Sequence, residues 1–525
     1  MKGGRTGGGA ARHVLSKSSF IRGCQCPKSL YLYKHHYSWR DPLSPAQAAI
    51  FRRGTNVGLL ARELFPGGTD ASPPTPFQYA RSVARTAELV AEGAPVVYEA
   101  AFMHEGVLAA MDILVRDASA PAAGRPAYRA YEVKSSAGVS ETYLLDAALQ
   151  YWVITGTGVR LSGLSIIHIE PGYIRGKELE LEKLFRVVNV AREAEERQGY
   201  VGSMVRELKQ VVSRPEAPEV EIGPHCHDPY PCDFIGTCWK DVPAYSVFDI
   251  ARLSIEKKFE LYRKGILEPA AVPDDYPLSE KQRFQTEAAK DGNPRIDRGS
   301  IRDFLDTMTY PLWFLDFEAF QPAVPLYEGT RPYQQIPFQF SLHRLDRPGS
   351  PRRPDPSGRR EDVSAAGLHH GEFLAEAGPD PRAPFLDALL EQIGESGTIL
   401  VYNQAFENGR LTDLAADLPE YLERIEKVQE RIVDLMVPFR DQSYYANEMH
   451  GSYSIKAVLP ALVPDLSYAH LAIRDGTEAS VAFESLTREE NPRRRAQVRR
   501  RLLDYCALDT LAMVKILEVL EQAAQ

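Results

Sequence analysis

Long apolar runs are absent from this chain of 525 residues, and cysteine, tryptophan and methionine are scarce. No stretch of about eighteen consecutive apolar residues occurs, which excludes an ordinary transmembrane helix. The first twelve residues are rich in glycine and have no apolar core, so we expect a disordered tail over residues 1–12 and no signal peptide. These absences predict a cytoplasmic protein without membrane contact, whose cysteines stay reduced.

The chain also has no large excess of positive or negative charge, since 62 lysines and arginines and 71 acids leave a net charge of −9. This balance argues against a general nucleic-acid binder but allows a local basic groove, because affinity follows individual phosphate contacts. Six arginines between residues 493 and 501 form such a local run. They indicate either a solvated helix face or a patch that contacts phosphates.

The length predicts two or three domains, and an apolar content of 44% is enough for ordinary cores. After the tail we expect an α/β protein in three parts: an N-terminal domain over 13–240, a helical connector over 241–300 and a C-terminal domain over 301–525. Residues 346–362 are rich in proline, arginine and glycine and predict a loop or a disordered insertion. Residues 333–340 predict a strand, and residues 451–456 are either close to a substrate or a plain helix entry.

Four acids and one tyrosine in the last third of the chain form the clearest pattern. Asp316 and Glu318 follow an apolar run that predicts a buried strand, on which side chains two apart share a face. Tyr505 and Asp509 are four apart in a helical stretch and also share a face. With Glu407 they offer the oxygen ligands that suit Mg²⁺ or Mn²⁺. A pair of such ions stabilises the attacking and leaving oxygens of a phosphodiester displacement.

These segments resemble the three motifs of the DEDD exonucleases, which have an RNase H-like fold. The matching residues are Asp316 and Glu318 for the first motif, Asn403 and Glu407 for the second, and Tyr505 and Asp509 for the third. The resemblance implies that the acids hold two metal ions and that Tyr505 orients the attacking water. Glu407 stands where the family usually has Asp, and Asp413 is a weaker substitute for it.

The six cysteines are unevenly placed along the chain. They are Cys24 and Cys26 near the start, an evenly spaced triplet of Cys226, Cys232 and Cys238, and an isolated Cys506. Reduced thiols in such a pattern indicate a metal centre. The paired Cys-x-x-Cys knuckles of a zinc ribbon are missing, whereas one distant cysteine and a triplet are enough for four thiolates around an iron–sulfur cluster.

This arrangement resembles the iron–sulfur branch of the RecB-like nucleases. The resemblance implies a [4Fe–4S] cluster held by four cysteines: Cys26, Cys226, Cys232 and Cys238. Cys26, which precedes a proline, fits the first ligand best, and Cys24 is the spare. Two alternatives remain open, namely a zinc ion with His225 and His227 as extra donors, or simple buried cysteines.

A second group of polar residues lies between the two sets of cysteines. The sequence predicts strands at 96–102, 107–115 and 128–133 and a helix at 140–154. Asp112 on the second strand, Glu-x-Lys on the third and Gln on the helix resemble a PD-(D/E)XK nuclease core. The resemblance implies that Asp112 and Glu132 bind metal and that Lys134 activates the attacking water. Glu99 is an additional candidate ligand, and Gln150 matches the RecB helix motif.

Together the two resemblances imply a metal-dependent nucleic-acid phosphodiesterase, and the C-terminal half also resembles a bacterial domain without assigned function. We expect an exonuclease on DNA, with single-stranded DNA favoured and RNA possible, in DNA processing, repair or defence. Two alternatives are a nucleic-acid-binding scaffold with degenerate sites, and an RNA exonuclease with a structural zinc site. The sequence names no protein partner.

Overall fold

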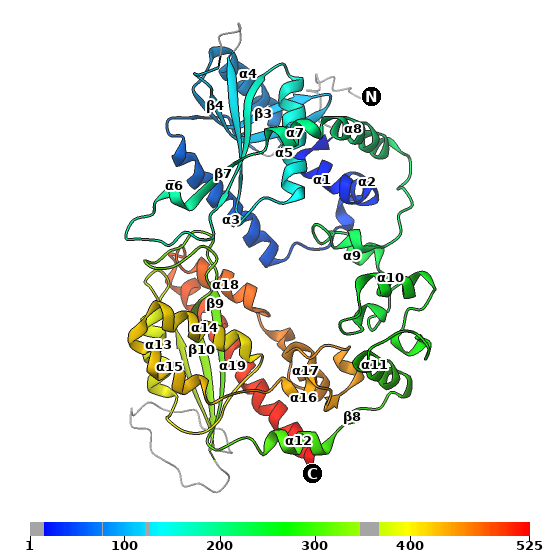
Figure 1. Cartoon of the computed structure of the whole chain (residues 1–525), viewed down its shortest axis with the longest axis vertical. Helices are drawn as coiled ribbons and strands as arrows, with labels where there is room; N and C mark the ends of the chain where they lie inside the picture. Colours follow the sequence, from blue (N-terminus) through cyan, green and yellow to red (C-terminus); the bar gives the residue numbers. More distant parts are fainter. Residues whose placement is uncertain (1–14, 76, 121–125, 347–366) are drawn as a thin grey trace, which may run out of the picture. The chain divides into compact units, whose positions relative to one another are not determined.

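The computed structural model describes residues 15–75, 77–120, 126–346 and 367–525 (Figure 1). The expected tail over 1–12 lies outside these residues, and so does all but the first residue of the loop expected at 346–362. In the described part of the chain, no helix combines the length and the apolar character that crossing a membrane requires.

The chain divides into two compact units. The first comprises residues 1–241 and 323–333, and the second comprises residues 242–322 and 334–525. The segment expected as a connector is therefore grouped, except for Asp241, with the second unit. The chain passes from one unit to the other three times, because residues 323–333 return to the first unit.

A mixed seven-stranded sheet forms the centre of the first unit. Its strands are β1 (Leu15–Ser16), β2 (Thr69–Asp70), β3 (Val96–His104), β4 (Val107–Arg116), β5 (Ala127–Lys134), β6 (Arg160–Ile169) and β7 (Phe185–Asn189). They follow the order β2-β3-β4-β5-β6-β7, with β1 beside β4. The three strands predicted from the sequence are confirmed as β3, β4 and β5, and their apolar residues fill the core on both faces of the sheet.

Nine α-helices are described in the first unit. They are α1 (Lys17–Gln25), α2 (Pro27–His35), α3 (Pro45–Ala61), α4 (Tyr79–Glu92), α5 (Glu141–Gly156), α6 (Leu181–Leu184), α7 (Ala191–Glu196), α8 (Gln198–Ser213) and α9 (Ile235–Cys238). Helix α5 confirms the helix predicted at 140–154, and Ser140 caps its N-terminus. It is apolar on most sides because it packs between the sheet and helices α1, α7 and α8.

A mixed five-stranded sheet forms the centre of the second unit, in the order β11-β10-β9-β12-β13. The strands are β9 (Leu312–Phe320), β10 (Ile336–Leu345), β11 (Leu368–Leu374), β12 (Ile399–Val401) and β13 (Ile432–Asp434). Strands β9, β10 and β11 are antiparallel, whereas β12 and β13 run parallel to β9. The strand predicted at 333–340 is correct from Ile336 onwards and wrong before it, because Tyr333 has a φ of 59° and belongs to the first unit.

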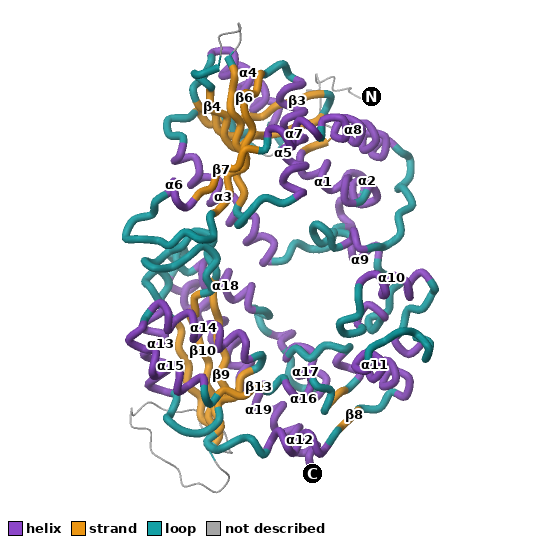
Figure 2. Tube along the Cα trace, in the orientation of Figure 1, coloured by secondary structure: helices purple, strands orange, loops and turns teal. Residues whose placement is uncertain are grey.

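Ten α-helices and a small β-ribbon complete the described part of the second unit (Figure 2). They are α10 (Ile255–Arg263), α11 (Glu280–Asp291), α12 (Arg298–Leu305), α13 (Arg382–Gln392), α14 (Gln404–Asp417), α15 (Leu422–Gln429), α16 (Val437–Arg440), α17 (Ile455–Leu462), α18 (Gly476–Ser485), α19 (Pro492–Ala524), β8 (Arg295–Ile296) and β14 (Tyr444–Tyr445). One face of the sheet, with Trp313, Leu315 and Phe317 of β9, packs against α13 and α14. The 33-residue helix α19 packs against β9 and β10. The side chains of β9 that alternate with Trp313, Leu315 and Phe317 face this helix.

Candidate functional site

Three acids, of which two are buried and one is half-buried, meet in the second unit. The ligand oxygens of Asp316, Glu318 and Asp509 all lie within 4.8 Å of one another. Asp316 and Glu318 share one face of β9, and α19 brings Asp509 to that face. Among the residues that the structure describes, no other group of three His, Cys, Asp or Glu side chains is this compact. This trio is therefore the best candidate centre for a divalent metal ion.

The burial of these acids makes their charged forms unfavourable without a cation. Burial, followed by repulsion from Asp509, raises the pKa of Asp316 well above its usual value. Burial and then repulsion from Asp316 and Asp509 do the same to the pKa of Glu318. Burial raises the pKa of Asp509 to about 6, although hydrogen bonding by Tyr468 and the nearby charge of Lys456 favour its charged form. A divalent ion between the three would offset these penalties.

Glu407 is the fourth acid of this site. It lies in the first turn of α14 with only 1% of its surface exposed, and burial followed by repulsion from Asp316 raises its pKa. No described residue donates a hydrogen bond to its buried Oε2 atom. An unpaired buried carboxylate oxygen requires a partner, so Glu407 fits the role of a further metal ligand. Asp413, the weaker substitute, is instead paired with Arg410 at 2.7 Å.

Asn403 supports this region through the backbone and not through its side chain. It stands in the left-handed conformation, with a φ of 78°, between β12 and α14. Its N–H donates to Asp434 Oδ1 at 2.9 Å. Asp434 ends β13, is 4% exposed and contributes to the raised pKa of Glu407. Asp434 was not predicted from the sequence, although its place at the end of an apolar strand beside β12 is a usable signal.

Two tyrosines and a lysine surround Asp509. Tyr468 donates to Asp509 Oδ1 at 2.6 Å, and hydrogen bonding by Tyr505 also favours the charged form and lowers the pKa of Asp509. Lys456 Nζ lies 5.8 Å from the ring centre of Tyr468 and 5.5 Å from that of Tyr505. Lys456 is exposed and makes no hydrogen bond or ion pair with another described residue. Tyr468 was not predicted, because it lies in a short 3₁₀ turn without a sequence signal.

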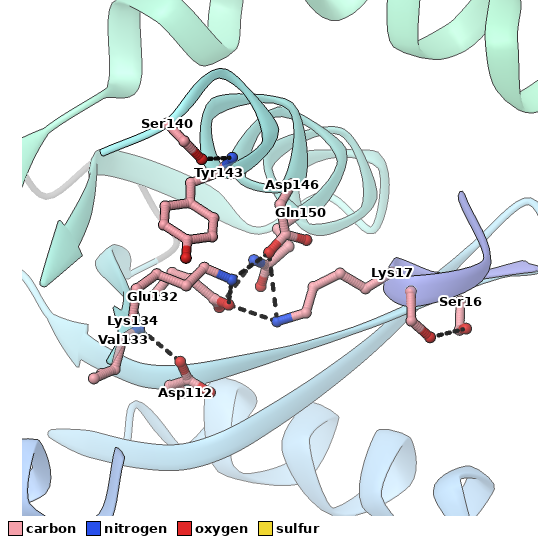
Figure 3. A network of polar contacts seen from close by, with 11 residues as sticks. Ser16, Lys17, Asp112, Glu132, Val133, Lys134, Ser140, Tyr143, Asp146 and Gln150 are labelled. Atoms are coloured by element: carbon pink, nitrogen blue, oxygen red, sulfur yellow. Dashed lines mark hydrogen bonds and ion pairs between the residues drawn. The ribbon is translucent and has the colours of Figure 1, made fainter. Parts of the chain in front are cut away.

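In the first unit, Asp112, Glu132 and Lys134, which the sequence predicts for a second metal site, lie close together (Figure 3). Lys134 Nζ donates to Glu132 Oε1 at 2.7 Å, and Gln150 Nε2 donates to Glu132 Oε2 at 2.9 Å. Asp112 Oδ2, from the neighbouring strand β4, accepts from the N–H of Val133 at 2.6 Å. The four predicted residues Asp112, Glu132, Lys134 and Gln150 therefore form one polar cluster.

Two members of this cluster were not predicted from the sequence. Lys17, at the start of α1, donates to Glu132 Oε1 at 2.6 Å, and Asp146 Oδ2 accepts from Lys134 at 2.6 Å. Burial alone would raise the pKa of Glu132, but Lys134 and Lys17 outweigh it and lower the pKa to about 2. Burial and then repulsion from Glu132 raise the pKa of Asp112 to about 7. Asp146 was detectable, since it lies one helical turn before Gln150.

Glu99 lies at the edge of this cluster and is already paired. Its Oε1 accepts from Arg62 at 2.9 Å, and its backbone has a φ of 52° within β3. Its charge nevertheless contributes to the raised pKa of Asp112. While Oε1 stays paired with Arg62, Oε2 is the oxygen that Glu99 can offer to a metal ion.

The four predicted cysteine ligands line one pocket of the first unit. The pocket contains Cys26, Cys226, Cys232 and Cys238. Cys26 ends α1 and caps α2, whereas Cys24 is directed elsewhere and hydrogen-bonds with Tyr200. Burial and the neighbouring thiols raise the pKa of Cys26 and of Cys238. A bound metal ion would offset these shifts by stabilising the thiolate forms.

The spacing of the sulfurs bears on which metal suits this pocket. Thiolates on one tetrahedral zinc ion stand about 3.8 Å apart, given Zn–S bonds of about 2.3 Å. No three ligand atoms from these cysteines or from His225 and His227 gather within 4.8 Å in the described residues. His225 also lines the pocket, with Nε2 3.9 Å from Cys226 Sγ, whereas His227 packs on the Trp239 ring. The pocket offers four thiols, which fit an iron–sulfur cluster, and the His225 imidazole, which is a zinc donor.

Comparison with known proteins gives a family for a stretch of the chain that lies mostly in the second unit. Residues 313–454 match DUF2779, a domain of unknown function. This stretch contains Asp316, Glu318 and Glu407 but ends before Lys456 and Asp509.

A curated relative shows a more distant likeness. Over 216 residues the chain is 26% identical to the "Uncharacterized protein MG366 homolog" of Mycoplasma pneumoniae. The match covers 39% of this chain and 31% of that protein, so the chain spans about a third of its relative's length. Neither description names an activity. The chain thus carries a DUF2779 domain at residues 313–454 and is distantly similar to an uncharacterised Mycoplasma protein.

Proposed function

We propose that the protein is a metal-dependent nucleic-acid phosphodiesterase, an exonuclease on single-stranded DNA whose catalytic site is in the second unit. The observation that carries this proposal is the convergence of Asp316, Glu318 and Asp509 within 4.8 Å. The unpaired Oε2 of buried Glu407, close enough to Asp316 to shift the pKa of Glu407, adds a fourth ligand. Four carboxylates from three chain segments, three of them buried and that of Asp316 half-buried, are a donor set for hard divalent ions.

Each residue of this site has its own role in such a reaction. A pair of Mg²⁺ or Mn²⁺ ions supplies charge stabilisation at the attacking and leaving oxygens when bound. Asp316, Glu318, Glu407 and Asp509 would hold these ions. Tyr505 orients the attacking water, and Tyr468 keeps Asp509 in place through its 2.6 Å hydrogen bond. Lys456 has free N–H donors and is positioned to contact a substrate phosphate.

The arrangement of the second sheet also supports this proposal. Its central strand β9 carries two of the acids, with antiparallel neighbours on one side and parallel strands on the other. This is the arrangement that an RNase H-like exonuclease fold implies. In the first unit, we propose a PD-(D/E)XK nuclease-like fold with an iron–sulfur cluster at the four cysteines.

The proposal is tested with the full-length protein, labelled single-stranded DNA or RNA, and Mn²⁺. Asp316→Asn with Glu318→Gln should abolish release of nucleotides, because both changes remove metal ligands. Asp303→Asn, an exposed acid on α12 of the same unit, is the matched control and should retain full activity. Cleavage that persists in the double variant, or no cleavage by the wild type with any divalent metal, would overturn the proposal.

A second candidate function concerns the first unit alone. Glu132 is already neutralised by two lysines, so this cluster is also suited to holding a strand without cutting it. If the first unit only binds, Glu132→Gln will leave cleavage unchanged and alter only the affinity for DNA. If it cuts, cleavage will remain after the Asp316 and Glu318 substitutions and disappear with Glu132→Gln.

A further inference from the structure

Lys17 occupies an unusual position in the polar cluster of the first unit (Figure 3). It is the first residue of α1, yet its Nζ lies 2.6 Å from Glu132 Oε1 and 3.8 Å from Asp146 Oδ2. Lys134 contacts the same two acids at 2.7 and 2.6 Å. The carboxylates of Glu132 and Asp146 are almost fully buried, whereas the Lys17 side chain is 29% exposed. Of the two lysines that contact this buried pair of acids, Lys17 is the more exposed to solvent.

The charges at this cluster are close to balance because of Lys17. Three acids, Asp112, Glu132 and Asp146, face the two ammonium groups of Lys17 and Lys134, which leaves one carboxylate uncompensated. The nearby Glu99 is paired with Arg62, which it shares with Asp70. Without Lys17, two carboxylates would be left uncompensated, a charge that suits a further divalent cation.

Two buried oxygens next to Lys17 have no hydrogen-bond donor among the described residues. They are Asp146 Oδ1 and Gln150 Oε1, on side chains that are 5% and 0% exposed. These residues are one turn apart on α5 and share a face, and Gln150 also contacts Glu132. These oxygens lie near the Glu132 carboxylate, which binds the ammonium group of Lys17. Carboxylate and amide oxygens are the ligands that Mg²⁺ or Mn²⁺ prefers.

We propose that Lys17 is a resident cation of this cluster, occupying a position that a divalent ion would otherwise take. Asp112 and Glu132 are then left with a single, weakly bound divalent ion in the wild type. Removal of Lys17 opens a second position at Glu132, Asp146 and Gln150. The inference rests on the proposed function only in that the first unit binds a divalent metal at all.

The test is to count bound Mn²⁺ by electron paramagnetic resonance of the free ion, which does not depend on activity. The full-length protein carries Asp316→Asn and Glu318→Gln to weaken metal binding in the second unit. In this background Lys17→Met and Lys17→Gln should bind one additional Mn²⁺ and tighten overall affinity at least about tenfold, since a like charge close to the ion is removed. Lys17→Arg should behave as Lys17 does, and Lys183→Met, at an exposed lysine of the same unit, should change nothing.

The outcomes separate this inference from the proposed function. An additional Mn²⁺ that disappears again with Glu132→Gln supports the resident cation. Equal Mn²⁺ stoichiometry and affinity with and without Lys17 overturn it, whether or not the enzyme is active. The proposed function is assessed separately, by whether the otherwise wild-type protein loses Mn²⁺ when Asp316 and Glu318 are substituted.

Discussion

The metal-free second unit should be stabilised by replacing Asp509 with asparagine. Burial raises the pKa of Asp509 from 3.8 to about 6. Because the folded state then binds the proton more tightly than the unfolded state, stability is lost as pH rises from about 4 to about 6, and the loss is complete above pH 6. A shift of about two units corresponds to about 3 kcal/mol. Asparagine has the same shape and no charge, and its oxygen still accepts from Tyr468.

The measurement is urea unfolding at pH 8 in the presence of a chelator. Trp313 on β9 is the one tryptophan of the second unit, so its fluorescence reports on the fold that surrounds the acids. With an m-value of about 3 kcal/mol/M, Asp509→Asn should raise the urea midpoint by about 1 M. Adding Mn²⁺ at a hundred times its Kd should stabilise the wild type by about 2.7 kcal/mol and the variant by less. The difference between the urea midpoints of the two proteins should therefore become smaller.

The reasoning would be refuted by either of two results. If Asp509→Asn unfolds at the same urea concentration as the wild type without metal, the buried charge of Asp509 does not destabilise the folded protein. The site then needs no cation to offset that charge. If Mn²⁺ stabilises both proteins equally, Asp509 is not a ligand. A repeat at pH 4 is the internal control, since the difference between the two proteins should largely vanish there.

Three further predictions follow from the two sites. Lys456→Ala should lower kcat/KM on single-stranded DNA about a hundredfold without weakening Mn²⁺ binding, since the lost charge repels the ion, and Lys456→Arg should restore part of kcat/KM; an unaltered kcat/KM would show that Lys456 does not contact the phosphate. Tyr468→Phe should weaken Mn²⁺ binding because Asp509 loses its 2.6 Å hydrogen bond, whereas Tyr505→Phe should lower kcat by a larger factor than it weakens Mn²⁺ binding; identical behaviour of the two variants would contradict these separate roles. Cys26→Ser should remove bound iron and visible absorbance from protein purified without oxygen, and Cys24→Ser should not, so loss in both would point to a different ligand set.

The sequence predicted those parts of the sites that local patterns determine. Strand β9 was visible as an apolar run, and the pairing of Tyr505 with Asp509 followed from helical periodicity. Once these two elements were identified, the alternation of side chains on a strand was enough to place Asp316 and Glu318 on one face.

The parts that tertiary packing determines could not be predicted in this way. Lys17 reaches Glu132 over 115 positions of sequence, and Tyr468 reaches Asp509 over 41, with no periodicity that links either pair. Tyr333 stands in an alternating stretch typical of a strand, yet packs in an apolar cluster of the first unit and donates to the carbonyl of Ser135 at 2.8 Å. A local pattern gives no information about such long-range preferences.

The return of residues 323–333 to the first unit affects how the protein folds during translation and whether it can be separated into fragments that fold. Ala323 and Tyr333 pack into an apolar cluster with Val57, Ala61 and Tyr173, and Arg175 donates to the carbonyl of Pro325 at 2.8 Å. During translation this cluster remains incomplete until the ribosome has passed residue 333, well after the strands of the first sheet have emerged. A gene fragment that stops at residue 241 would therefore encode a product with exposed apolar surface, and proteolysis between the units would not release two intact halves.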